Sequence, residues 1–252
     1  MYTKKDLMGN MAEMGIDPKG TLLVHSSMKA IGPVEGGADT VLDAMIEYMK
    51  DGLLILPTHT WRQIGLQNPV FNAATEPSCV GLLTNMFMKR PGVVRSLHPT
   101  HSVAAIGADA AEYVKGEEKA TTPCPRNGCW GRLYDRRAQI LMLGVKLNRY
   151  TYLHSVEEWA DIPNRLTIDP HLLYTVLPDG QVVAVPQHRH SGANSEYFVK
   201  VDEIFAQRGA MKLGRFGDAE CRLCDAVRTA DLTLELLRED MNLFGTPDPL
   251  GK

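Results

Sequence analysis

The amino-acid sequence predicts an α/β fold built on a mixed sheet. Two apolar runs, at 53–57 and 138–145, have the length of buried strands and are separated from other such runs by stretches with helical periodicity. Further along, segments 172–178 and 181–186 flank the turn Pro178-Asp179-Gly180, which predicts an antiparallel hairpin added to the sheet. With 252 residues and 44% hydrophobic content, we expect a single domain over residues 1–252.

The first elements follow the order helix, strand, helix, strand. Residues 3–15 predict an amphipathic helix with Thr3 as its N-cap and Gly15 at its end. A short strand at 21–24 leads through a polar loop into a helix at 39–50, and the strand at 53–57 follows. Residues 58–78 then form a loop of a length that is usually functional or disordered.

The second half of the chain continues the alternation. We expect a helix at 79–90, a strand of small residues at 102–107, a short helix at 128–137 and the buried strand at 138–145. A helix within 148–162 follows that strand. After the hairpin, two helices at 195–208 and 218–240 close the chain.

Composition excludes several classes of partner. The formal net charge is −3, the isoelectric point is near 6.2, and the basic residues are scattered, so we expect no nucleic-acid partner. No segment approaches the roughly 18 consecutive apolar residues of a membrane span, so we expect no membrane partner. Five cysteines, an odd number, favour a reducing compartment over a disulfide framework. We therefore expect a soluble, cytoplasmic protein.

The pattern HxxE at 154–157 is the leading candidate for a general base. Positions three apart share a helix face, so Glu157 can meet His154, and Glu158 lies near the same face. An imidazole beside a carboxylate that fixes its tautomer is the usual make-up of a general base. Taken alone, the same spacing also fits an exposed helical pair.

Polar residues also follow two predicted strands at their carboxyl ends. Ser26 and Ser27 stand in a strand–loop–helix unit, an arrangement that suits a phosphate or a thioester-bearing chain, although it also fits a plain polar turn. His59 and Thr60 come just after the strand at 53–57, where open α/β sheets bind ligands. Both stretches are candidate binding segments.

Four blocks taken together resemble the aminoglycoside 3-N-acetyltransferase family of the antibiotic N-acetyltransferase superfamily. They are VHSSMKAIG at 24–32, LPTHTW at 56–61, RSLHPTHSVAAIG at 95–107 and LHSVEEW at 153–159. Their order and spacing agree with that family from about residue 4 to the C-terminal helix. The resemblance implies a layered α/β/α fold with a central mixed sheet, distinct from that of the commoner acetyltransferases. The (R/Q)xxGx(G/A) phosphate loop of those enzymes does not occur in this chain.

The implied activity is direct acetyl transfer from acetyl-CoA, as co-substrate, to an amine of a small molecule, in aminoglycosides the 3-amino group of the deoxystreptamine ring. By resemblance, His154 is the catalytic base and Glu157 its partner, and no metal is expected. Direct transfer is favoured over an acyl intermediate on Ser155, which would point off another helix face. The resemblance leaves a homodimer open.

The remaining site residues are also carried over from the family's blocks. The coenzyme would contact Ser26, Ser27, Met28 and Lys29 in the first block, and Arg95, Ser96 and Ser102 in the third. We expect the amine substrate to meet His59, Thr60 and Glu158.

One departure concerns the amine. The loop 61–78 lacks the acidic, tryptophan-rich insertion of the family's resistance enzymes, so the residues identify acetyl-CoA more specifically than the acceptor. Glu158, Asp161 and Asp169 are the acids expected to supply negative charge near the base.

Two other classes of function stay open. A metal-dependent hydrolase would gather imidazoles at the strand ends, drawn from His59, His98, His101 and His154. A second ligand set joins Cys221 and Cys224 with His188 and His190, although CRLC fits a packed helix face. The other class is a non-catalytic protein that binds CoA or polyamines, against which the intact HxxE pattern argues.

Overall fold

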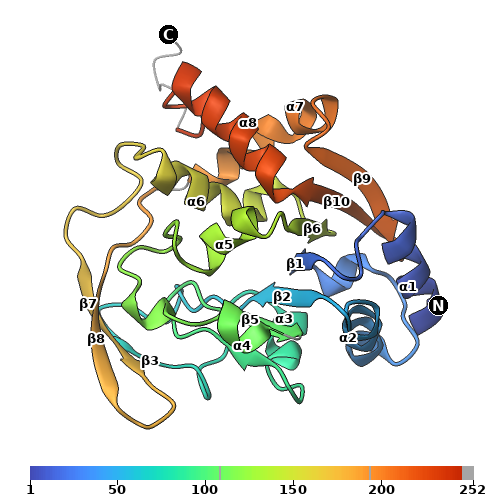
Figure 1. Cartoon of the computed structure of the whole chain (residues 1–252), viewed down its shortest axis with the longest axis horizontal. Coiled ribbons are helices and arrows are strands. Elements are labelled where there is room, and N and C mark those ends of the chain that lie inside the picture. Colours follow the sequence, from blue (N-terminus) through green and yellow to red (C-terminus); the bar gives the residue numbers. More distant parts are fainter. Residues whose placement is uncertain (108, 193, 246–252) are drawn as a thin grey trace.

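A seven-stranded mixed sheet forms the centre of the molecule (Figure 1). The computed structural model describes residues 1–107, 109–192 and 194–245. The strand order is β4-β5-β2-β1-β6-β10-β9. The strands are β1 (Thr21–Ser26), β2 (Leu53–Pro57), β4 (Val94–Arg95), β5 (Val103–Gly107), β6 (Gln139–Leu143), β9 (Met211–Phe216) and β10 (Ala219–Asp225).

The three central strands determine where a ligand can bind. β1 pairs in parallel with both β2 and β6, whereas β5 and β10 run antiparallel to their neighbours. The carboxyl ends of β2, β1 and β6 therefore meet at one edge, with Ser26 opposite Leu143. β5 begins at this edge, because Val103 pairs with Pro57, so the segment before β5 joins the same edge.

Helices cover both faces of the sheet, giving the predicted layered α/β/α arrangement. One face carries α1 (Lys4–Glu13), α2 (Gly37–Tyr48) and α3 (Leu82–Phe87), and the other carries α5 (Cys129–Asp135), α6 (Tyr152–Trp159) and α8 (Ala226–Glu239) (Figure 1). Strand residues are divided between two apolar cores. In β1, Leu22 and Val24 belong to the core under α1 and α2, whereas Leu23 belongs to the core under α6. Both faces of β1 are thus buried, as expected for a central parallel strand.

The predicted hairpin is present but belongs to a different sheet. β7 (His171–Val176) pairs antiparallel with β8 (Val182–Gln187), and β7 also pairs in parallel with β3 (Val70–Asn72). This three-stranded sheet stands apart from the main sheet, at the left of Figure 1. The expectation that the hairpin extends the central sheet is therefore wrong. β3 lies inside the long loop 58–78 and supplies the edge with which the hairpin pairs.

The sequence prediction is also wrong at the start of the last helix. Residues 219–225, expected to be helical, form β10, and α8 begins only at Ala226. Cys221 and Leu223 face one core and Cys224 the other, which is the two-residue period of a strand. Consequently CRLC is a strand motif. The missed elements also include β9, the two-residue β4, the short α4 (Ala110–Tyr113), and the division of 195–208 into a 3₁₀ segment at Asn194–Val201 and α7 (Asp202–Gln207).

Local capping signals explain where two helices begin. Thr3 caps α1 as predicted: its hydroxyl accepts from the backbone N–H of Asp6, and the Asp6 carboxylate accepts from the N–H of Thr3. Asp225 caps α8 by accepting from the N–H of Arg228. No helix within residues 1–107, 109–192 and 194–245 is long and apolar enough to cross a membrane.

Helix α5 packs tightly against the loop that precedes it because it contains a glycine. A Cβ on Gly131 would lie 1.8 Å from the carbonyl oxygen of Arg126, so no larger residue fits there without backbone movement. The neighbouring Trp130 joins α5 to the segment before β5, because its indole N–H donates to the carbonyl of His101 at 3.0 Å. The position of α5 thus contributes to the geometry of the strand-end loops.

We expect Gly131→Ala to lower the free energy of unfolding by about 1–3 kcal/mol, because the methyl group overlaps the backbone. The matched control is Gly9→Ala on the exposed side of α1, where no atom lies within 4 Å of the new Cβ. There the better helix propensity of alanine should raise that free energy by up to about 1 kcal/mol. Urea unfolding followed by tryptophan fluorescence measures both. Equal effects of the two substitutions would contradict the tight packing of α5.

Candidate active site

A cleft of about 680 Å³ opens at the carboxyl ends of β1, β2 and β6. Its walls come from segments distant in sequence: the end of β1, the loop after β2, the segment before β5, helix α6 and the chain after β8. Imidazoles dominate its inner end. The inner wall is formed by His25, Ser26, His59, His101, His154 and His190.

His154 and Glu157 form the pair that the HxxE spacing predicts. In α6, Nδ1 of His154 lies 3.1 Å from Oε2 of Glu157. The Glu157 side chain is only 1% exposed, whereas that of His154 is 16% exposed and lines the cleft. Because the carboxylate engages Nδ1, that nitrogen carries the proton in the neutral ring, and Nε2 is the accepting atom. The pair has the make-up of a carboxylate-oriented general base.

Arg165 is a third member of this group, which the sequence reasoning missed. Its Nε donates to Oε1 of Glu157, and its side chain is 9% exposed. A buried carboxylate needs such a counter-charge, because an unpaired charge in the interior is costly. Arg165 reaches back because Asp161 (φ 50°) and Asn164 (φ 61°) adopt left-handed backbone conformations after α6. No spacing rule connects positions 157 and 165 across such a turn.

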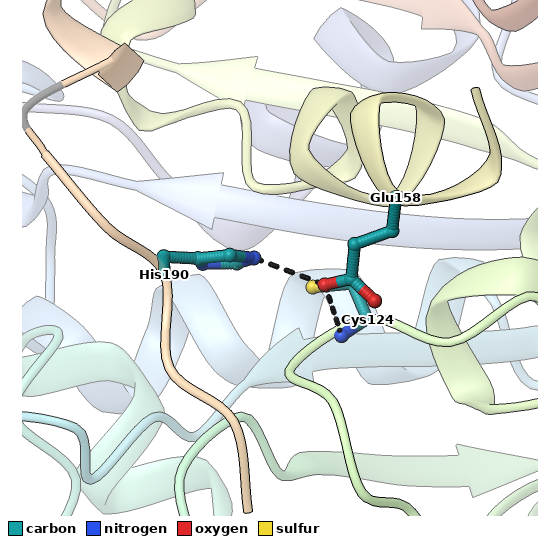
Figure 2. A group of neighbouring side chains, drawn as sticks. All are labelled: Cys124, Glu158 and His190. Carbon is teal, nitrogen blue, oxygen red and sulfur yellow. Dashed lines mark hydrogen bonds and ion pairs between the residues drawn. The ribbon is translucent and has the colours of Figure 1, made fainter. Parts of the chain in front are cut away.

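A second imidazole–carboxylate pair lies directly beside the first. His190, just after β8, has its Nε2 3.0 Å from Oε1 of Glu158, and the backbone N–H of Cys124 donates to the same oxygen at 2.9 Å (Figure 2). The rings of His190 and His154 are stacked, with centroids 4.0 Å apart. Burial raises the pKa of Glu158 to about 7. Burial, together with the neighbouring charge of His154, lowers the pKa of His190 well below its usual value.

The expectation that Glu158 contacts the substrate is therefore corrected. Its carboxylate is engaged by His190 and Cys124 and lies behind the cleft wall. Asp161 and Asp169 are exposed and do not line the cleft either. The charged groups on the cleft wall, among residues the structure describes, are Arg62, Arg149, Arg189 and Glu196. The wall is thus more basic than expected.

Cys124, Glu158 and His190 are also the three side chains best placed to hold a metal ion. One candidate ligand atom from each lies within 4.8 Å of the others (Figure 2). Thiolate, carboxylate and imidazole are all zinc ligands. However, burial, reinforced by the charge of Glu158, raises the pKa of the Cys124 thiol well above its usual value, which disfavours the thiolate. The hydrogen bonds already formed by Glu158 favour an acid–base pair over a metal centre.

Neither metal set considered from the sequence is complete, although His59, His101 and His154 line the cleft together. His98 uses both ring nitrogens: Nδ1 accepts from the N–H groups of Thr100 and His101, and Nε2 faces the carbonyl of Thr122 at 2.9 Å. Cys221 and Cys224 lie on opposite faces of β10, so they cannot converge with His188 and His190 on one ion.

Of the four residues expected to hold coenzyme in the first block, Ser26 lines the cleft. The backbone N–H of Ser27 donates to the carbonyl of Leu143, which fixes the turn beside the end of β6. Met28 and Lys29 lie in the 3₁₀ turn Met28–Ala30; Met28 packs against the core, and Lys29 is exposed. In this block the cleft is lined by Val24, His25 and Ser26 at the end of β1, and not by the turn itself.

The third block plays a different part from the one expected. Arg95 does not line the cleft: its guanidinium donates to Thr58 and Ser102 and to the carbonyls of Ala73 and Glu76. The Ser102 hydroxyl also bonds that of Thr58 at 2.8 Å. These buried contacts tie the loop after β2 to β5. The expected direct contact of Arg95 and Ser102 with coenzyme does not fit this geometry.

Ser96 is buried in the same way. Its hydroxyl accepts from the backbone N–H of Val103 at 3.1 Å, beside the cleft edge of the sheet but outside the cleft wall. The expected coenzyme contact of Ser96 is corrected for the same reason, because its hydroxyl is used inside the sheet.

The two substrate candidates after β2 differ in orientation. His59 lines the cleft, its Nε2 lies 3.2 Å from the hydroxyl of Thr151, and its ring stacks on Trp130 at 5.4 Å. Burial lowers the pKa of His59 well below its usual value, so this ring is neutral. Thr60 is fully buried and its hydroxyl donates to the carbonyl of Pro99, which corrects the expectation that it faces the substrate.

Comparison with known proteins agrees with this architecture. The family model of aminoglycoside 3-N-acetyltransferases matches residues 23–238. Aminoglycoside N(3)-acetyltransferase IV of a Salmonella species is 29% identical over 239 residues, which cover 94% of this chain and 86% of the relative. The acetyltransferase-like protein YokD of Bacillus subtilis is 26% identical, covering 91% of this chain and 90% of the relative.

Solved structures share the fold over nearly the whole chain. A histidine-to-alanine mutant of aminoglycoside acetyltransferase AAC(3)-IVa, in complex with a gentamicin, superposes with a TM-score of 0.87 at 28% identity, covering 99% of this chain and 93% of that one. The predicted fold class and enzyme class, an acyltransferase, are thereby confirmed. The chain belongs to the aminoglycoside 3-N-acetyltransferase family.

Proposed function

We propose that this protein transfers the acetyl group of acetyl-CoA directly to an amine of an aminoglycoside, in the family's pattern the 3-amino group, with His154 as general base. The observation that carries the proposal is the His154 ring, which lines the cleft while Glu157 and Arg165 hold it from the buried side. The family membership and the relative solved with a gentamicin support an aminoglycoside as acceptor.

The chemistry of thioesters explains why a base is needed. An amine attacks the thioester carbonyl only as the free base, and the attacking nitrogen becomes positively charged as the new bond forms. In the proposed reaction, Nε2 of His154 accepts a proton from that nitrogen and donates it to the departing sulfur. Glu157 stabilises the imidazolium formed between these steps, as a buried carboxylate does in a hydrolase triad.

Arginines on the cleft wall suit the phosphates of the coenzyme. A Cβ on Gly144 would lie 2.3 Å from that of Ala30, so the segment after β6 packs directly against the turn at 26–30. Arg149 follows in that segment and lines the cleft together with Ser26. A guanidinium beside a backbone turn is a common way to bind phosphate, and we propose that the coenzyme lies here.

We place the reaction in the cytoplasm. All five cysteines are free thiols in the structure, which suits a reducing compartment. A homodimer stays a prediction.

The direct test is a thiol-release assay with purified protein, acetyl-CoA and a panel of aminoglycosides. We expect release of CoA thiol that depends on an aminoglycoside. Coenzyme binding without release by any amine would instead indicate the non-catalytic binder. Stoichiometric zinc together with metal-dependent hydrolysis would indicate the hydrolase.

Replacing the base should separate catalysis from binding. We expect His154→Ala to lower kcat by about 10²- to 10⁴-fold, the usual contribution of a general base, with the Kd of CoA nearly unchanged. Thiol release and isothermal titration calorimetry measure the two quantities. Comparable losses of turnover and CoA affinity would mean that the histidine is structural.

The buried ion pair makes a prediction about stability. Arg165→Leu leaves Glu157 charged and unpaired in the interior, so the free energy of unfolding should fall by about 3–5 kcal/mol. Adding Glu157→Leu removes the stranded charge and should recover most of that loss, although the double variant lacks the carboxylate that orients His154. Urea unfolding of the two single variants and the double variant measures the coupling. Additive losses would show that the two side chains do not interact.

A further inference from the structure

The proposed reaction has a proton balance that one base does not complete. At neutral pH an aliphatic amine is largely an ammonium ion, since its pKa is near 10. The balanced reaction is R–NH₃⁺ + CH₃CO–S–CoA → R–NH–COCH₃ + HS–CoA + H⁺. The N–C bond forms and the C–S bond breaks. Two protons leave nitrogen, of which one ends on sulfur and the other in solvent.

His154 can carry only one of these protons at a time. Its Nδ1 is held by Glu157, so Nε2 is the single accepting position. If Nε2 first deprotonates the ammonium ion, it must lose that proton before it can assist the attack. A second acceptor beside His154 would remove this conflict.

The structure contains a second acceptor at that position. His190 lines the same cleft, stacked on His154 with an interplanar angle of 25° and a centroid separation of 4.0 Å. Its Nε2 is held by Glu158, just as Nδ1 of His154 is held by Glu157. In each pair one ring nitrogen meets a buried carboxylate, and adjacent residues of α6 supply both carboxylates.

We propose that His190, held by Glu158, is a second base of this site, which takes the first proton from the substrate ammonium and delivers it to solvent, while His154 takes the second and delivers it to sulfur. The inference rests on the proposed acetyl transfer. It assigns a chemical task to a pair that the HxxE motif does not include.

The charges around His190 are compatible with this task. The His190 ring faces His154 and Glu158, both from α6. It also faces His101 from the segment before β5, with the ring centroids 5.1 Å apart. Arg189 directly precedes it in the chain. Two imidazolium ions with ring centroids 4.0 Å apart would repel each other. Glu158 offsets this repulsion, because a proton taken up by the pair neutralises the carboxylate.

The pair formed by Glu158 and His190 titrates near neutral pH. Burial raises the pKa of Glu158 to about 7 and lowers that of His190, so the pair gains or loses a single proton near neutral pH. Above that pH the pair is ready to accept a proton from an incoming ammonium ion. Below it the pair is already protonated and is no longer an acceptor.

The test is the pH dependence of kcat/KM for His190→Asn, with the aminoglycoside that the wild-type protein acetylates fastest. Near pH 7 we expect a loss of about 10²-fold relative to wild type. Near pH 9.5 roughly a quarter of an amine with a pKa near 10 is already the free base, against roughly a thousandth at pH 7, so the loss should shrink to about threefold or less. Glu158→Gln should show the same pH-dependent pattern. In both variants thermal unfolding checks that the fold is retained.

The matched control is His188→Asn. This substitution removes an imidazole from the same segment, but Nδ1 of His188 bonds the carbonyl of Thr167 and its ring does not line the cleft. The ratio of its kcat/KM to that of the wild type should not change with pH. A pH-independent loss in His190→Asn would overturn the second base and leave the proposed function intact. Absence of thiol release from the wild type would remove both.

Discussion

The buried carboxylate of Glu157, shared between His154 and Arg165, is the interaction on which the rest of the site depends. At 1% exposure it is tolerated only because a cation meets one oxygen and an imidazole meets the other. This arrangement fixes the ring orientation, and therefore which nitrogen faces the cleft. Helix α6 supplies both His154 and Glu157, and the turn after α6 brings Arg165 back to the same carboxylate.

The sheet topology explains why so many imidazoles gather at one place. Three parallel strands and one antiparallel neighbour bring four loops to the same edge, and each contributes polar residues. Burial keeps most of these rings neutral: it lowers the pKa of His25 to about 3 and that of His98 to about 4. His98 and His59 therefore act mainly as hydrogen-bonded packing elements. Only His154 and His190 combine a cleft position with a carboxylate partner among the described residues.

Sequence patterns predicted the parts of this structure that depend on local spacing. The strands at 53–57 and 138–145, the cap at Thr3 and the meeting of His154 with Glu157 all follow from short-range periodicity. The patterns did not predict partners that meet through the tertiary fold. Arg165 reaches Glu157 through a turn with left-handed residues, and Glu158 meets His190 across 32 positions. Motif blocks also gave no side-chain direction, so the inward-facing Arg95 and Thr60 were assigned to ligands.

The role of His154 as a base depends on which of its ring nitrogens carries the proton. Nitrogen-15 NMR of the histidine side chains measures this directly. The His154 signals can be assigned by their loss in His154→Ala. We expect neutral His154 to carry its proton on Nδ1, with Nε2 unprotonated, and we expect this preference to weaken in Glu157→Gln. A neutral ring protonated on Nε2, or a tautomer that does not respond to the change at Glu157, would contradict it.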